Sequence, residues 1–342
     1  MAQTLGEPPR PVIVVAGFGV TRLYDPDTRV YVWGTGHATF RTRYEDDLDL
    51  PASGHDRLVP RGFTGSRGPV NIAYQLTEGL RRYGRYVEGR SVYPFAYDWR
   101  LSARENAAKL GAFIDEIAPH TRVDVVTHSA GAIVALTYVK LQHGAGRVDH
   151  LVLVAPTQRG VIDAFRVLVR PERFIRRSFT PQMVETWPAI PELFPEDGHF
   201  LVDSAGRTIE FDAWQPRSWR TLLASTTPAF ERSIIEARAF RDELRDAPFP
   251  PDVKLTVIAG DCVDTAVRVL MRPDGSLVFY PGELRENERG LQKLLFEPGD
   301  GTVPISSARN GGDAMIFCDG HQGIASDPNV LHALVQTLRD QR

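Results

Sequence analysis

The hydrophobic positions of this chain fall into short, uninterrupted runs separated by more polar stretches. Each run has about the length of a strand, is rich in Val, Ile and Leu, and ends at Gly, His or Pro. Runs of this type are typical of parallel strands that are covered on both faces. The predicted strands lie at 11–17, 122–128, 149–156, 253–260 and 314–320.

Segments with helical periodicity lie among these strands, at 71–84, 103–119 and 130–144. Alternation of strand and helix predicts an α/β fold with a mostly parallel central sheet and helices on both faces. Ligand sites in such sheets lie at the carboxyl ends of the strands. Candidate chemistry is therefore sought where the predicted strands end.

Two segments break the alternation. Residues 21–65 are rich in Tyr, Asp, Gly and Pro, with short strands expected around RVYVWG, and residues 157–250 carry many prolines and aromatic clusters. The second segment stands between two sheet strands, so we expect it to form a cap over the strand ends. The predicted organisation is a core of residues 1–156 and 251–342 with a cap or lid at 157–250.

The 342 residues are 42% hydrophobic and 24% charged, as expected for a globular protein with a large core. A net charge of −3 provides no basic field, which argues against a nucleic-acid partner. One dense basic cluster, RPERFIRRSF at 170–179, is interpreted as a solvated surface or as a contact for an anionic group or a membrane surface. Peripheral membrane contact through the cap is therefore a possibility.

The two cysteines, Cys262 and Cys318, are too few for a disulfide-stapled scaffold and lack metal-ligand spacing. No metal and no cofactor is predicted. The N-terminal stretch has no basic region and no cleavage-like site, so a cytoplasmic location is expected. Both cysteines follow late strands and could lie close together, but free thiols are expected in a reducing cytosol, and a bond between them would argue for export.

The stretch VVTHSAGAIVAL at 125–136 runs from a predicted strand straight into a predicted helix. Ser129 stands at the turn, with Gly131 two residues later. This is the context of a nucleophile elbow, usually G-x-S-x-G, although Thr127 replaces the first glycine. The alternative is that Ser129 simply caps the following helix.

A serine nucleophile needs a base and a carboxylate that orients the base, and on a hydrolase sheet the chain order is Ser, acid, His. Asp300 in EPGDGTVPISS and His321 just after the last predicted strand follow Ser129 in this order. Asp264, in a short loop after strand 253–260, competes as the acid, and Asp261 is a weaker rival.

An oxyanion hole needs two backbone N–H donors. Ala130, directly after the serine, provides one, and Phe18 in the glycine-rich loop after the first strand is the candidate for the other. His128 adjoins the serine, but neighbours on an extended strand point in opposite directions, so we expect its side chain to pack elsewhere.

Five stretches together resemble the lecithin:cholesterol acyltransferase family of α/β-hydrolases, which includes lysosomal phospholipase A2 and phospholipid:diacylglycerol acyltransferases. They are VVAGFGVTRL, PFAYDWRLS, VTHSAG, PGDGTVP and GHQGIASDP, and they span nearly the whole chain. The segment TWPAIPELFP is also similar to the cap of bacterial members. The resemblance implies an α/β-hydrolase fold with an inserted cap.

Position by position, the resemblance implies Ser129 as nucleophile, Asp300 as acid and His321 as base, and this is the reason for preferring Asp300 over Asp264. It also matches Phe18 and Ala130 to the oxyanion donors. Asp98, Trp99 and Arg100 of the YDWR stretch would line or brace the cleft. The alternative for these three is a buried ion pair beside a core tryptophan.

The expected function is hydrolysis of carboxylic esters, as in lipases, phospholipases or esterases, through a Ser-Asp-His triad and an acyl-enzyme. Alternatives are an acyltransferase that moves an acyl group from a lipid to an alcohol, and a non-catalytic binding protein with a hydrolase fold. The substrate is expected to be a small-molecule or lipid ester. The oligomeric state is not determined by the sequence. Aromatic residues of the predicted cap suggest an apolar substrate part or simply hold the cap together: Phe165, Phe174, Phe179, Trp187, Phe194, Trp214 and Trp219.

Overall fold

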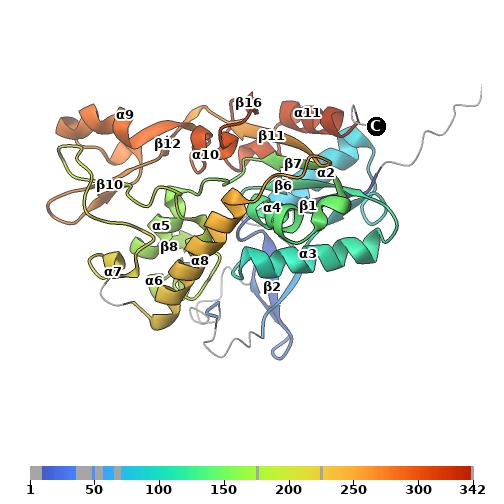
Figure 1. The fold of residues 1–342 in the computed structure, drawn as a ribbon, viewed down its shortest axis with the longest axis horizontal. Helices are drawn as coiled ribbons and strands as arrows, with labels where there is room; N and C mark the ends of the chain where they lie inside the picture. Colours follow the sequence, from blue (N-terminus) through green and yellow to red (C-terminus); the bar gives the residue numbers. More distant parts are fainter. Residues whose placement is uncertain are drawn as a thin grey trace, which may run out of the picture.

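The computed structural model contains a six-stranded sheet flanked by helices, with a second lobe beside it (Figure 1). It describes residues 10–35, 48–50, 57–64, 71–174, 177–223 and 226–339, and the side chains of residues 172–178 are not among those described. The sheet strands are all parallel, in the order β16-β11-β7-β6-β1-β5. Their bounds are β1 (Val12–Val15), β5 (Val92–Pro94), β6 (Val123–His128), β7 (Val148–Val154), β11 (Lys254–Gly260) and β16 (Met315–Phe317).

The two faces of this sheet form two separate apolar cores, because side chains alternate along a strand. On β1, Ile13 and Val15 face one core, whereas Val12 and Val14 face the other. The first core is completed by α3 and α4, and the second by α2 and α11. The predicted sheet with helices on both faces is confirmed, and its helices are α2 (Ile72–Gly84), α3 (Ala103–Ile117), α4 (Gly131–Leu141), α10 (Ile305–Arg309) and α11 (Pro328–Arg339).

A small antiparallel sheet packs below the main one in Figure 1, in the order β3-β2-β4. The short strand expected around RVYVWG is β3 (Val30–Trp33). It pairs with β2 (Thr21–Asp25), which also pairs with β4 (Val59–Phe63). Parts of the segment 21–65, at 36–47 and 51–56, lie outside the described residues.

Most of the segment 157–250 lies beside the sheet and forms the second lobe (Figure 1). Its longest helix is α8 (Pro228–Asp246), which begins where the Thr227 side chain accepts a hydrogen bond from the Phe230 amide at 3.1 Å. Residues buried every three or four positions, from Phe230 to Leu244, form one apolar stripe on this helix. The other elements are α5 (Ile162–Val169), β8 (Glu172–Phe174), β9 (Arg177–Phe179), α6 (Pro181–Val184), β10 (Leu201–Val202) and α7 (Pro216–Trp219).

The second lobe also receives residues from after β11. Strand β10 pairs in parallel with β13, which in turn pairs with β14. The segment 157–250 therefore shares a small sheet with residues that the sequence placed in the core, whereas the boundary of the cap stays a prediction. The later elements are β12 (Val263–Ala266), β13 (Val269–Met271), β14 (Leu277–Val278), α9 (Gln292–Leu295) and β15 (Phe296–Gly299).

Aromatic rings hold the second lobe together. Trp219 is fully buried and contacts the rings of Phe165 and Phe230 at centroid distances of 5.5 and 5.4 Å. Phe194 stacks on the same indole at 5.1 Å. The side chain of Phe174 lies outside the described part of the chain. Most of the aromatic residues noted in the sequence are therefore packed into the protein interior, whereas Phe179 also lines the cavity beside Ser129.

Candidate active site

Ser129 lies at the sharp turn between β6 and α4, in a left-handed backbone conformation with φ of 56°. This conformation is unusual for a residue other than glycine and is typical of functional turns. The turn is possible because two glycines stand close to other backbone. A Cβ on Gly131 would lie 2.2 Å from the Val15 carbonyl oxygen, and one on Gly17 would lie 2.7 Å from the Ser129 Cβ. The local sequence therefore produces the predicted elbow geometry, with Thr127 remaining within β6.

His321 lies between Ser129 and Asp300. Its Nε2 is 2.9 Å from the Ser129 hydroxyl, and its Nδ1 is 2.8 Å from Asp300 Oδ2. The Asp300 side chain is 1% exposed and that of His321 is 15% exposed. Three residues separated by 171 and 21 positions along the chain thus form one continuous series of hydrogen bonds at the carboxyl ends of the strands.

The carboxylate of Asp300 is held by its own loop. Its Oδ1 accepts hydrogen bonds from the Thr302 amide at 2.9 Å and the Val303 amide at 2.7 Å. Burial favours the protonated acid, but the His321 ring and these two amides outweigh it, so the pKa of Asp300 lies below its usual value. Asp300 is therefore held as a carboxylate facing Nδ1 of His321.

The rival acids lie elsewhere. Asp264 is exposed on β12 and accepts a hydrogen bond from Gln292 Nε2 at 2.9 Å. Asp261 is also exposed. The structure brings Asp300 to His321 because the turn after β15 lies beside the loop that follows β16, and the His321 amide donates to the Asp300 carbonyl at 2.8 Å.

The two candidate oxyanion donors lie beside the serine. Phe18 and Ala130 both line the cleft that contains Ser129. Within the part of the chain that the structure describes, neither backbone N–H donates a hydrogen bond. Phe18 is held from behind, because its ring lies edge-on to Trp99 with a centroid distance of 4.4 Å.

None of Asp98, Trp99 and Arg100 lines the cleft, although Trp99 lines a small neighbouring cavity together with Phe18 and Ala130. Asp98 and Arg100 form an ion pair at 2.7 Å with side chains only 2% and 0% exposed. Arg100 also donates to the Leu48 carbonyl, and Trp99 donates through Nε1 to the Thr21 carbonyl at 3.1 Å. This arrangement is the buried ion pair beside a core tryptophan, and its link to the site is the contact of Trp99 with Phe18.

His128 does not pack away from the site, contrary to the sequence expectation. Its ring is fully buried, lies 4.7 Å from the His321 ring, and its Nε2 is 2.8 Å from the His321 carbonyl oxygen. Alternation along a strand fails here because Ser129 is already in the left-handed turn. Burial and then the nearby His321 lower the pKa of His128 to about 3, so the ring is neutral and its Nε2–H donates to the carbonyl.

The cleft has a volume of about 210 Å³ and mainly apolar walls. The second lobe contributes Val161 and, from α5, Ala164 and Val167 to the lining. One ion pair also faces it, in which Arg166 Nε donates to Asp163 Oδ1 at 3.0 Å. The cleft therefore suits a ligand with an apolar part next to the serine.

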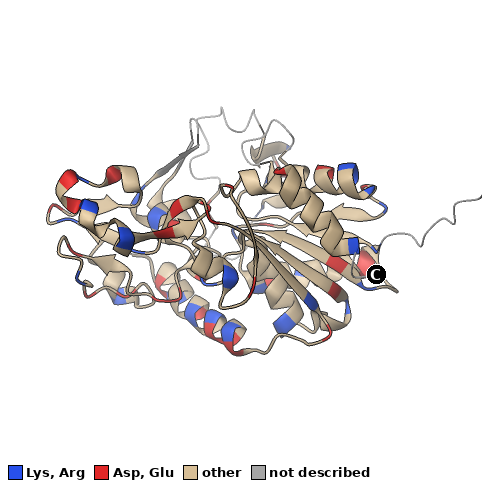
Figure 2. Cartoon of the chain, turned by 90° about the horizontal axis from the view of Figure 1, so that it is seen from above, with Lys and Arg blue, Asp and Glu red and all other residues tan. Residues whose placement is uncertain are grey.

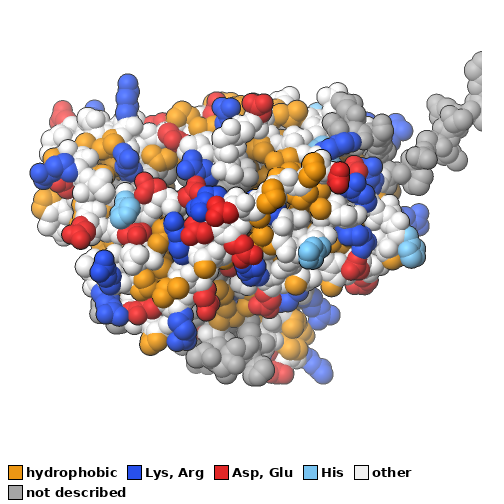
Figure 3. All heavy atoms as spheres, in the orientation of Figure 1, with side chains coloured by type: hydrophobic (Ala, Val, Ile, Leu, Met, Phe, Trp, Pro, Cys, Tyr) orange, Lys and Arg blue, Asp and Glu red, His pale blue; other side chains and the backbone are white. Residues whose placement is uncertain are grey.

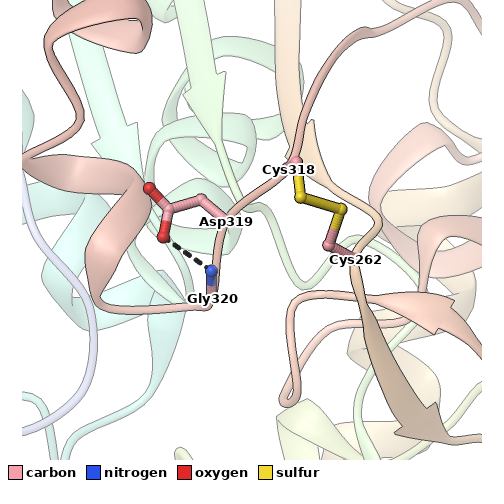
Figure 4. The surroundings of a disulfide bond; sticks show 4 residues. All are labelled: Cys262, Cys318, Asp319 and Gly320. Atoms are coloured by element: carbon pink, nitrogen blue, oxygen red, sulfur yellow. Dashed lines mark hydrogen bonds between the residues drawn. A yellow bond between two sulfur atoms is a disulfide. The ribbon is translucent and has the colours of Figure 1, made fainter.

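Cys262 and Cys318 form a disulfide, with Cα atoms 4.9 Å apart (Figure 4). The expectation of free thiols is wrong. The two cysteines meet because β11 and β16 are adjacent parallel strands and both end at this edge of the sheet. The bond ties the loop after β11 to the segment that leads, three residues later, to His321.

Among the described residues, no three His, Cys, Asp or Glu side chains gather in a way that could hold a metal ion. In the same part of the chain, no helix combines the length and the apolar character needed to cross a bilayer.

Residues 66–218 match the model of the lecithin:cholesterol acyltransferase family, which confirms the resemblance found in the sequence. The matched region contains Ser129 and the YDWR stretch but neither Asp300 nor His321. An enzyme that acts on lipid esters, as a hydrolase or an acyltransferase, is supported by this match. No curated protein sequence matches the chain.

Comparison with solved structures gives one clear match in fold and several weaker superpositions. A chain in a crystal structure of the Tle4-Tli4 complex superposes with a TM-score of 0.66 at 15% identity, covering 99% of both chains. The mature form of the Bacillus licheniformis lipase BlEst2 gives a TM-score of 0.46 at 14% identity, covering 96% of this chain and 91% of that one. The phospholipase PlaB from Legionella pneumophila gives 0.37 at 14% identity, covering 74% and 39%. The chain has the predicted α/β-hydrolase fold, and at these identities the likeness concerns the fold alone.

Proposed function

We propose that the protein is a serine hydrolase that cleaves carboxylic esters with an apolar acyl or alcohol part. The observation that carries this proposal is the hydrogen-bonded series from Ser129 through His321 to Asp300 at the floor of an apolar cleft. A serine that merely caps a helix needs neither a histidine on its hydroxyl nor a buried carboxylate behind that histidine.

In the first half of the reaction, His321 Nε2 removes the proton of the Ser129 hydroxyl as Oγ attacks the ester carbonyl carbon. Asp300 keeps the proton of the imidazole on Nδ1, so that Nε2 is free to accept. The amides of Phe18 and Ala130 donate to the negative oxygen of the tetrahedral intermediate, where one lost donor costs about 3 kcal/mol. His321 then gives its proton to the alcohol that leaves.

In the second half, water attacks the acyl-enzyme while His321 accepts its proton, and collapse of the second tetrahedral intermediate releases the acid and restores Ser129. The cleft is smaller than the roughly 300–1,000 Å³ of typical sites for drug-sized ligands. We therefore expect short and medium acyl chains to be the best substrates in a p-nitrophenyl ester series.

The test is active-site labelling with a fluorophosphonate probe. The intact protein should be labelled and Ser129→Ala should not, whereas Ser306→Ala, which changes an exposed serine outside this cleft, should be labelled normally. Equal labelling of both variants would remove the serine from the mechanism. A folded protein that takes no label and hydrolyses no ester would support the non-catalytic alternative.

Transfer to an alcohol is the second candidate, because the family whose model matches is named for an acyltransferase. Both activities share the acyl-enzyme and differ only in what resolves it. Product analysis with an added long-chain alcohol separates them: free acid indicates hydrolysis, and a new ester indicates transfer.

The predicted cytoplasmic location now has an observation against it. The Cys262–Cys318 disulfide is unusual in a compartment that keeps thiols reduced. Alkylation of the protein in intact cells, followed by mass spectrometry, tests the point. Blocked thiols would support a cytoplasmic location, and a protected disulfide would support an exported enzyme.

A further inference from the structure

A second cavity, of about 150 Å³, lies between α4 and α8 and collects more cations than carboxylates. Basic and acidic residues alternate along α8 in Figure 2, and Figure 3 shows charged side chains gathered over the end of this helix nearest the sheet. Five basic and two acidic residues line the cavity. The basic residues are Lys140, Arg159, Arg238, Arg241 and Arg245, and the acidic residues are Glu196 and Asp242.

Both carboxylates are already used by three of the arginines. Asp242 accepts from Arg238 at 3.0 Å and from Arg245 at 2.7 Å. Glu196 accepts from Arg159 at 2.6 Å and lies 3.8 Å from Arg245. These contacts form an ordinary ion-pair network. Lys140 and Arg241 take no part in it.

Within the described part of the chain, Lys140 and Arg241 donate hydrogen bonds only to backbone carbonyls. Lys140 donates to the Leu244 carbonyl and Arg241 to the Gln158 carbonyl. No carboxylate of the described residues lies within ion-pair distance of either cation. From further away, Asp246 attracts Lys140, and Arg241 is attracted by three carboxylates, those of Glu196, Glu192 and Asp242.

Burial and a neighbouring arginine disfavour the charged form of each of these cations: the neighbour of Lys140 is Arg241, and that of Arg241 is Arg245. Burial and then the charge of Arg241 lower the pKa of Lys140, and burial lowers that of Arg241 to about 10. A lysine has three N–H donors and an arginine has five, so most of these donors remain for a ligand. A cavity lined by like charges that carboxylates do not fully compensate gains stability when an anion enters it.

We propose that this cavity binds an oxyanion of phosphate size between Lys140 and Arg241. Its volume is about five times that of a water molecule in the liquid, which leaves room for one phosphate group. Arginine and lysine are the side chains that proteins use to bind phosphate oxygens. The shared chemistry fits a free phosphate ion or the phosphate of a lipid headgroup.

The cavity is separate from the proposed active site. Helix α4 begins two residues after Ser129, and Lys140 stands near its other end, about 15 Å away at 1.5 Å per residue. Neither Lys140 nor Arg241 lines the cleft around the serine. Esterase activity therefore serves as a check of folding, and the proposal does not depend on it.

Binding is measured by isothermal titration of the intact protein with inorganic phosphate at constant ionic strength, and in parallel with phosphatidylglycerol vesicles. Lys140→Met and Arg241→Met keep the apolar stems and remove the charges. Each should weaken binding about tenfold or more, as expected for loss of a charge-assisted hydrogen bond. The control is Arg232→Gln, an exposed arginine on the same helix, which should bind as the unchanged protein does.

Thermal unfolding distinguishes a variant that has lost phosphate binding from one that folds poorly. Without phosphate, Lys140→Met should melt no lower than the unchanged protein, because it relieves the repulsion of Arg241. With phosphate, only proteins that keep both cations should gain in Tm. Charge-dependent binding to vesicles alone would identify a lipid headgroup as the source. No binding of either ligand, or binding that all three variants share equally, would overturn the proposal.

Discussion

Two buried acid–base pairs lie near the nucleophile, and their contacts have almost the same length. Asp98 and Arg100 are 2.7 Å apart, and Asp300 and His321 are 2.8 Å apart. They differ in what the basic partner faces. Arg100 is 0% exposed and donates to its own surroundings, whereas His321 is 15% exposed and turns its second nitrogen to Ser129.

The difference shows that a short buried ion pair is not by itself a sign of chemistry. Both pairs come from the most specific stretches of the sequence, YDWR and GDGTVP with its downstream histidine. The first joins residues two positions apart, and the Trp99 between them packs against Phe18. The second joins two distant loops and opens into the cleft, and only this pair can exchange a proton with a ligand.

The largest expected effect is on the second pair. Asp300→Asn should reduce kcat by about 10⁴-fold, because an amide no longer holds the His321 tautomer that accepts from Ser129. Asp264→Asn is the matched control, and its kcat should stay close to that of the unchanged protein because Asp264 is exposed and bonds to Gln292. Steady-state kinetics with a p-nitrophenyl ester decides, and a larger loss in Asp264→Asn would reverse the assignment of the acid.

The first pair should respond in stability. Arg100→Met leaves the Asp98 carboxylate buried without its partner, which should lower the free energy of unfolding by about 3–5 kcal/mol. Urea unfolding measures this loss, and the folded variant should keep most of its kcat. Adding Asp98→Asn to the same protein should recover part of the stability, and failure to do so would mean that Asp98 is not the group left uncompensated.

The disulfide holds the His321 segment, and its removal should cost less than the loss of the buried arginine. It closes a loop between residues 56 positions apart, so Cys262→Ser with Cys318→Ser should lower stability by about 2–4 kcal/mol. Thermal unfolding with and without reductant measures this. Reductant should destabilise the unchanged protein and leave the double variant unaffected, and insensitivity of both would mean that the bond does not form.

The smallest effect at neutral pH concerns His128, because it appears only as the pH falls. Its pKa is about 3 in the folded protein and about 6.5 when unfolded, so the unfolded chain binds the extra proton. Stability should therefore fall as the pH drops from 6.5 toward 3, by at most about 1.4 kcal/mol per unit. His128→Asn should flatten this part of the curve. The lowered pKa of Asp300 acts in the same direction only at lower pH, below the ordinary value of 3.8.

Much of the fold could be predicted from the sequence because the sheet is buried on both faces. Continuous apolar runs located β1, β6, β7, β11 and β16 to within a few residues. Strand β5 (Val92–Pro94) was missed because its three residues give no run, and it exists only through pairing with β1. Helix α8 was missed because its stripe is diluted by charged residues.

For the site, chain order and motif context pointed to Ser129 and His321, and the family resemblance favoured Asp300 over Asp264. They were not enough to place His128, because the strand rule does not hold at a left-handed turn. The cavity at Lys140 and Arg241 had no signal at all, since these residues are 101 positions apart and look like ordinary surface charges.

By itself, the sequence determined which segments form the sheet and which residue types stand at the ends of its strands, because hydrophobic periodicity and turn chemistry are local properties of the chain. Only the tertiary structure decided that His128 packs against the ring of His321, that the two cysteines are bonded, and that, among the described residues, no carboxylate lies within ion-pair distance of Lys140 or Arg241. These outcomes depend on distances between segments far apart in the chain, and such distances are set by how the whole core packs.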